Sequence, residues 1–113
     1  MSKFKYLSIA AGLLTVSMLM GIPGVVVADS STGKRVFAQW CDACHMDSPF
    51  APGTIQLKQT RGANRAVVEK RTDLTEPLVR SFVRSGFAGM PKFRRMEISD
   101  ADLDALVKYL VNP

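Results

Sequence analysis

The distribution of apolar residues separates an N-terminal apolar run from the rest of the chain. Two lysines near the start precede the run 6–20, glycine and proline interrupt it at 21–24, and short side chains end it at Ala28. A basic start, an apolar stretch and a small-residue end are typical of a secretory signal peptide, so we predict cleavage after Ala28. The span 6–27 is also long enough to cross a bilayer, which takes about 20 apolar residues. An uncleaved membrane anchor is therefore the alternative.

Two amphipathic helices are expected at the ends of the remaining chain. The first spans 33–40, and the last follows Ser99, a good N-cap residue with Asp102 three positions later. Apolar residues recur at helical spacing in both segments. They are Val36, Phe37 and Trp40 in the first, and Leu103, Leu106, Val107 and Leu110 in the last.

The same two helices carry the residues that a close crossing requires. Gly33 and Phe37 on the first helix would face Leu106, Tyr109 and Leu110 on the last. A glycine lets two helix backbones approach closely, because it has no Cβ atom. The alternative is ordinary core packing on two helices that do not touch.

A third helix is expected in the middle of the chain. Thr75 can cap it, Leu74 and Val79 are placed as a hydrophobic staple, and Gly86 lies just past its end. The segment 63–71 is predicted as a short helix and 48–53 as a loop, the latter from its turn residues. No convincing strand run follows the signal, so the predicted fold class is all-α.

Length and charge limit the number of domains and the kinds of partner that the exported part can have. Removing the 28 signal residues from 113 leaves 85, a size at which an apolar core alone gives only marginal stability. That part, 29–113, has room for one domain with 13 basic and 10 acidic residues, a net +3. So small an excess argues against a nucleic acid partner.

The chain has two cysteines and one histidine, and all three lie in Cys41-Asp42-Ala43-Cys44-His45. C-x-x-C-H is the spacing of covalent haem attachment, in which both thiols form thioethers and the histidine ligates the iron. A zinc site needs four ligands, and these residues supply three. A redox-active pair or a plain disulfide is the other alternative, but a thioredoxin-like pair belongs in a βαβ pattern that the chain does not have.

A haem iron in an electron carrier needs a second axial ligand, and the exported part offers three methionines. Met46 directly follows His45 and cannot reach the opposite face of the ring. Met90 follows a glycine-containing loop and precedes Pro91, which fixes the backbone next to the sulfur. We therefore predict Met90 as the ligand, with Met96 or a purely structural role for Met90 as alternatives.

Together these residues resemble a class I, single-haem c-type cytochrome. The resemblance rests on Gly33-x-x-x-Phe37 before the C-x-x-C-H motif, a Pro-Gly loop, Met90-Pro91 and the C-terminal L-x-x-Y-L pattern. It implies a small all-helical fold with crossing terminal helices, wrapped around one covalently bound haem c with His45 and Met90 as axial ligands. It also implies that a carbonyl near Pro52 accepts a hydrogen bond from His45 Nδ1. The chain reads Ala51-Pro52-Gly53 where the family usually has Gly-Pro.

A narrower resemblance concerns the segment 83–93. It is similar to the cytochrome subunit of para-cresol methylhydroxylase and of related eugenol hydroxylases, where a flavoprotein oxidises a para-substituted phenol and passes single electrons to the cytochrome. The chain departs from that subunit in the longer stretch 54–72. An insertion there could remodel the face that meets the partner.

Basic residues gather around Met90 in the sequence, and acids follow them. The basic set is Arg80, Arg84, Lys92, Arg94 and Arg95. It is a candidate docking patch that would steer an acidic partner. The alternative is a solvated face, in which some arginines neutralise the haem propionates.

The expected function is periplasmic electron transfer without catalytic residues in this chain. We expect a flavin-dependent dehydrogenase or hydroxylase, acting on a phenolic or aromatic alcohol, to donate the electrons, and a downstream acceptor to take them. One alternative is a free shuttle between a respiratory complex and a terminal oxidase. Another is a haem-based sensor in which the sixth iron position opens. The membrane would be a partner only if the signal stays attached.

Overall fold

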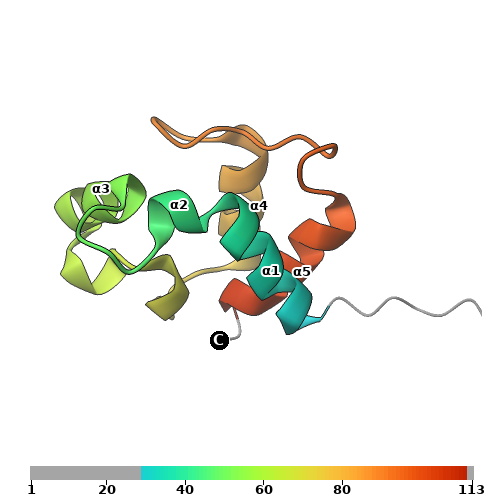
Figure 1. Cartoon of the computed structure of the whole chain (residues 1–113), viewed down its shortest axis with the longest axis horizontal. Coiled ribbons are helices and arrows are strands. Elements are labelled where there is room, and N and C mark those ends of the chain that lie inside the picture. The colour runs from blue at the N-terminus through green and yellow to red at the C-terminus, as the bar shows by residue number, and fades with distance from the viewer. Residues whose placement is uncertain (1–28, 112–113) are drawn as a thin grey trace, which may run out of the picture.

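The computed structural model describes residues 29–111, and these form helices joined by loops (Figure 1). The α-helices are α1 (Ser30–Trp40), α2 (Asp42–His45), α3 (Pro52–Arg61), α4 (Glu76–Ser85) and α5 (Asp100–Val111). Two 3₁₀ turns follow α3, namely η1 (Ala63–Arg65) and η2 (Val68–Lys70). Within 29–111 the only β pairing is one isolated bridge between Phe87 and Met90. The all-α prediction is confirmed, while the predicted signal peptide at 1–28 lies outside the described residues.

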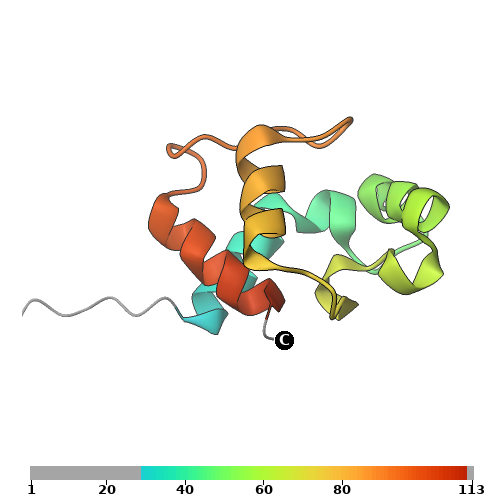
Figure 2. The ribbon, with the colours of Figure 1, turned by 180° about the vertical axis from the view of Figure 1, so that it is seen from behind.

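Helices α1 and α5 cross in direct contact, as the sequence predicted (Figures 1 and 2). A Cβ atom on Gly33 would lie 2.1 Å from the carbonyl oxygen of Ala105 and 2.5 Å from Tyr109 Cβ. No side chain other than hydrogen fits at such distances, so Gly33 is what permits the crossing. The rings of Phe37 and Tyr109 meet next to it, with centroids 6.2 Å apart.

Helix α4 completes the hydrophobic core against α5. The buried cluster takes residues from α1, α4 and α5 and from the turn before α5: Val36, Phe37, Val79, Val83, Ile98, Leu103, Leu106, Val107 and Leu110. Leu74 and Val79, the predicted staple pair, both pack in or against this cluster. The apolar periodicity of three helices therefore accounts for nearly all of the core.

Local signals fix where α4 and α5 begin and end. The Asp102 N–H donates to Ser99 Oγ at 3.0 Å, which confirms Ser99 as the N-cap residue of α5. Thr75 occupies the N-cap position of α4, although its side chain makes no capping hydrogen bond. Gly86 ends α4 with a φ of 68°, a conformation that favours glycine.

The middle of the chain differs from the sequence prediction. The predicted loop 48–53 gives way at Pro52 to α3, and the predicted helix over 63–71 is instead the two short turns η1 and η2. Pro52 is the first residue of α3, where its missing N–H is harmless and its φ suits a helix. Pro-Gly is also typical of a turn, so this helix was not predicted from the sequence. Among residues 29–111, no helix has the length and apolar character needed to span a bilayer.

Candidate haem site

The C-x-x-C-H segment lies where α1 passes into α2. The Cys41 N–H donates to Phe37 O at 2.8 Å at the end of α1, and the His45 N–H donates to Cys41 O at 2.9 Å in α2. The segment is therefore close to one helical turn. Residues spaced three and four apart share one helix face, so Cys41, Cys44 and His45 lie on the same side.

The two cysteines are free thiols in different surroundings. Cys44 is exposed, whereas Cys41 is partly buried and packs against the hydrophobic core. Burial, followed by the nearby charges of Asp42, Cys44 and Glu69, raises the pKa of the Cys41 thiol to about 12. Thiol exchange and zinc binding both need a thiolate. Within residues 29–111, no group of three or more His, Cys, Asp or Glu side chains converges as a metal site requires.

His45 is held against the first turn of α3. A Cβ atom on Gly53 would lie 2.7 Å from His45 Cε1 and 2.9 Å from its Nδ1, so the glycine backbone covers this edge of the ring. Burial lowers the pKa of His45, which favours the neutral imidazole that ligates metals. Its Nδ1 is buried without a hydrogen-bond partner.

The hydrogen bond expected between His45 Nδ1 and the Pro52 region is not formed. Pro52 is exposed at the start of α3, where a helical carbonyl points along the axis toward the N–H four residues later. The neighbouring Gly53 is the residue that contacts the ring, a contact that was not predicted from the sequence. Thr54 joins α3 to the end of α2, because its buried hydroxyl donates to Met46 O at 2.8 Å.

Met90 lies in a tight turn of the long segment between α4 and α5. The Met90 N–H donates to Phe87 O at 2.9 Å, and the Phe87 N–H donates to Met90 O at 3.1 Å. Ala88 takes a φ of 50° within this turn, and a Cβ atom on Gly86 would lie 2.7 Å from Met90 O. Glycine at position 86 is therefore required by both conformation and space. In Figures 1 and 2 the segment extends over the side of the molecule where α2 lies.

The three methionines weighed as ligands differ in their packing. Met90 is partly buried and packs against the core cluster, as Cys41 does. Met96 is 92% exposed, and Met46 is also exposed. Only Met90 among them contacts the cluster that Cys41 also touches.

The family model described as cytochrome c oxidase, cbb3-type, subunit III matches residues 28–110. The chain belongs to this family. It is thus a c-type cytochrome domain of the class I, single-haem kind and an electron-transfer haem protein. No match was found among the curated proteins, and none among the solved structures.

The residues of this cytochrome c domain fit a haem c. Two free thiols and the imidazole lie on one face of a helical turn, and the imidazole has a buried ring nitrogen without a partner. A thioether from a distant segment packs on the same apolar cluster as the first thiol. Cys41, Cys44, His45 and Met90 could therefore hold the group between them.

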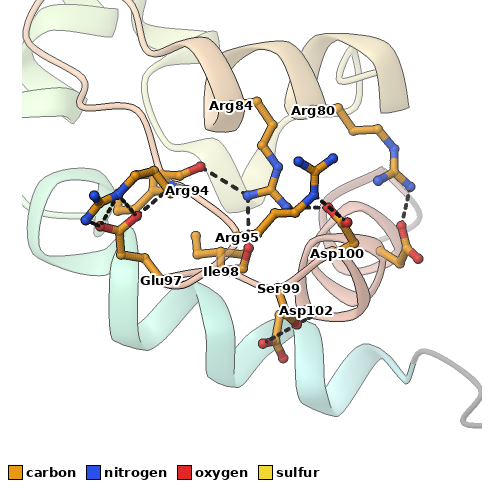
Figure 3. Close-up of polar contacts among 11 residues, drawn as sticks. Arg80, Arg84, Arg94, Arg95, Glu97, Ile98, Ser99, Asp100 and Asp102 are labelled. Carbon is orange, nitrogen blue, oxygen red and sulfur yellow. Dashed lines mark hydrogen bonds and ion pairs between the residues drawn. The ribbon is translucent and has the colours of Figure 1, made fainter.

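The basic residues around Met90 are mostly paired inside this cytochrome (Figure 3). Arg80 pairs with Glu76 and Asp104, Arg84 and Arg95 with Asp100, and Arg94 with Glu97. Lys92 is exposed and has no ion pair among the described residues. The sequence showed the clustering of basic residues but could not show that acids from α5 and its preceding turn lie beside them.

Proposed function

We propose that the chain is an exported electron carrier that binds one haem c. Cys41 and Cys44 hold the group covalently, and His45 and Met90 ligate its iron. The observation that carries this proposal is that Cys41 and Met90, from segments far apart in the sequence, pack on one apolar cluster. When bound, the haem supplies an iron that exchanges one electron, and methionine ligation raises its potential.

The test of the ligand set is spectroscopic and uses the full chain matured with haem. Met90→Ala should abolish the absorption band of a methionine–ferric haem bond and let the reduced protein bind carbon monoxide. Met46→Ala and Met96→Ala are matched controls that should leave both properties unchanged. Ready carbon monoxide binding by the wild type, or an unchanged spectrum in Met90→Ala, would favour the open-site sensor instead.

We propose the periplasm as the site of action, with the signal cleaved after Ala28. Support comes from the composition of 1–28 and from the C-x-x-C-H motif, since bacterial haem attachment takes place outside the cytoplasm. The mature protein should begin at Asp29 and carry the mass of one haem. A mature protein that retains its N-terminal run would instead be membrane-anchored.

For the electron donor, we propose a flavin-dependent dehydrogenase or hydroxylase that oxidises a phenolic or aromatic alcohol. The support is the resemblance of segment 83–93 to the cytochrome subunits of such complexes. Of the five basic residues expected to form the docking patch, we retain only Lys92. The four arginines already pair with acids of this chain. Copurification from native cells should recover a yellow flavoprotein in a stable complex. A cytochrome that remains a monomer at every stage contradicts this donor.

The family description supports a second candidate. It names a subunit of a cbb3-type oxidase, which is a terminal oxidase. The free shuttle would likewise carry electrons to a terminal oxidase. In that case the reduced cytochrome should be oxidised by membranes that contain an active terminal oxidase, and no flavoprotein should copurify. The two candidates therefore predict opposite results in the same purification.

A further inference from the structure

The segment 86–98, which carries Met90, is tied to the helices at few points. Most of its side chains are exposed, among them Phe87 and Met96. Its main-chain bonds to the helices are one at its start, from the Gly86 N–H to Phe82 O at 2.8 Å, and one further on, from the Phe93 N–H to Val83 O at 2.8 Å. In the far half, Ile98 is buried in the core cluster, and the Phe93 ring lies against Trp40 of α1 with centroids 5.9 Å apart.

Arg84 of α4 adds side-chain hydrogen bonds to two main-chain carbonyls of this half (Figure 3). Its Nη1 donates to Phe93 O at 3.1 Å and to Ile98 O at 2.9 Å. Its Nη2 donates to Asp100 Oδ1 at 2.9 Å, at the start of α5. One guanidinium therefore joins α4, two points of the Met90 segment and the N-terminus of α5.

The surroundings of Arg84 distinguish it from the other arginines of the set. Its side chain is 24% exposed, against 35% for Arg80, 73% for Arg94 and 77% for Arg95. Ile98 is fully buried, so its carbonyl depends on a protein donor rather than on water. A planar guanidinium can give several bonds at fixed angles, which a lysine ammonium cannot reproduce. The docking role expected for Arg84 does not suit a guanidinium that already donates three hydrogen bonds within the chain.

We propose that Arg84 is a positioning residue for Met90. It fixes the segment 86–98 at Phe93 and Ile98, and thereby limits how far the Met90 sulfur can move from the iron. This inference rests on the proposed function, in which Met90 is an axial ligand. It assigns Arg84 to ligand geometry rather than to partner docking.

The experiment compares Arg84→Gln with Arg80→Gln in the full, haem-loaded chain. Arg80 also joins α4 to α5, through Asp104, but it donates no hydrogen bond to the segment. Asp100→Asn is a second control that removes the ion pairs of Asp100 with Arg84 and Arg95 and leaves both carbonyl bonds of Arg84. Arg84→Lys asks whether charge alone is sufficient.

Two measurements are made on each variant. Hydrogen exchange reports the bonded amides of Met90 and Phe93. Titration of the ferric protein with imidazole reports how easily an added ligand displaces methionine, followed by the loss of the methionine–iron band. Arg84→Gln should speed exchange and raise imidazole affinity by about tenfold, the effect of roughly one lost hydrogen bond to a charged group. Arg80→Gln and Asp100→Asn should stay within about twofold of wild type, and Arg84→Lys should restore only part of the loss.

Several results would overturn the proposal. Wild-type exchange in Arg84→Gln would show that the segment does not need this contact. An equal effect of Arg80→Gln would indicate general packing of α4 on α5. Faster exchange in Arg84→Gln with unchanged imidazole affinity would show that Arg84 holds the segment but does not position Met90. If Met90→Ala keeps the methionine–iron band, the ligand assignment itself fails; if that band is lost while Arg84→Gln behaves as wild type, only the present inference fails.

Discussion

The helices α1, α4 and α5 form a core region, whereas α2, α3 and the turns η1 and η2 form a site region, and the two are built differently. Helix α5 alone buries five residues, while α2 buries none and α3 buries only Thr54. Phe50, in the loop between α2 and α3, is 87% exposed, and Ile55 of α3 is 38% exposed. The core region is stabilised by apolar burial, and the site region by close backbone contacts and hydrogen bonds.

The two regions of this small chain have different tasks. Burial of apolar surface is strong but does not specify direction, whereas glycine contacts and hydrogen bonds specify position. Gly53 against His45 and Thr54 against Met46 O place the histidine with little apolar burial. Stability therefore comes mainly from the core region, and the placement of His45 from the site region.

The largest effect should come from Gly33→Val in the core region. The new Cβ would lie 2.1 Å from a backbone oxygen of α5 that cannot move without separating the helices. We expect the free energy of unfolding to fall by more than about 3 kcal/mol, the upper end of usual overpacking losses. Thermal unfolding measures it. Gly89→Ala, which meets nothing within 4 Å, is the control, and a folded Gly33→Val protein with wild-type stability would refute the crossing.

The success of the sequence analysis follows the same division. Gly33, Phe37 and the apolar stripe of α5 predicted the crossing because burial leaves a periodic pattern. Ser99 as a cap was equally readable, since its partner lies three residues away. The core region was therefore predictable from sequence.

In the site region, residue types were predictable but their arrangement was not. Cys41, Cys44 and His45 lie within one turn, so their shared face follows from spacing alone. The contact of Gly53 with His45 and the helix that starts at Pro52 leave no periodic pattern. The ion pairs of Arg80 and Arg84 join α4 to α5 across long sequence distances, which no local signal reports.

The next largest contrast compares one truncation in each region. Leu106 is almost fully buried in α5, so Leu106→Ala should lower the free energy of unfolding by about 2–5 kcal/mol. Ile55 of α3 is exposed, and Ile55→Ala should change it by less than about 0.5 kcal/mol. Denaturant titration of both variants checks this. Similar losses at the two positions would mean that the site region has an apolar core of its own.

A smaller effect on stability, but a larger one on the site, should follow from Gly53→Ala. Its Cβ would meet Cys44 O at 2.7 Å and the His45 ring at 2.7 Å, so the imidazole must shift. We expect a loss of about 1–3 kcal/mol in unfolding free energy, together with a changed absorption spectrum of the haem-loaded protein. Gly89→Ala, near Met90, should change neither. A wild-type spectrum in Gly53→Ala would show that His45 is not positioned by this contact.

The smallest effect concerns Asp73, which lies in the connection between the site region and α4. Its carboxylate accepts from Arg71 Nε and Nη2, both at 2.8 Å, and lies 3.2 Å from Arg65 Nε in η1. These bonds, those of Arg71 first, lower the pKa of Asp73 to about 2. An unfolded aspartate has a pKa of about 3.9, so the contribution is present above about pH 4 and is lost as the pH falls through 2. Asp73→Asn should therefore unfold with a weaker pH dependence between pH 4 and 2 than wild type, and Arg71→Gln should behave alike. Acid titration followed by circular dichroism measures this; curves that stay parallel in that interval would show that the exposed pairs do not contribute to joining the regions.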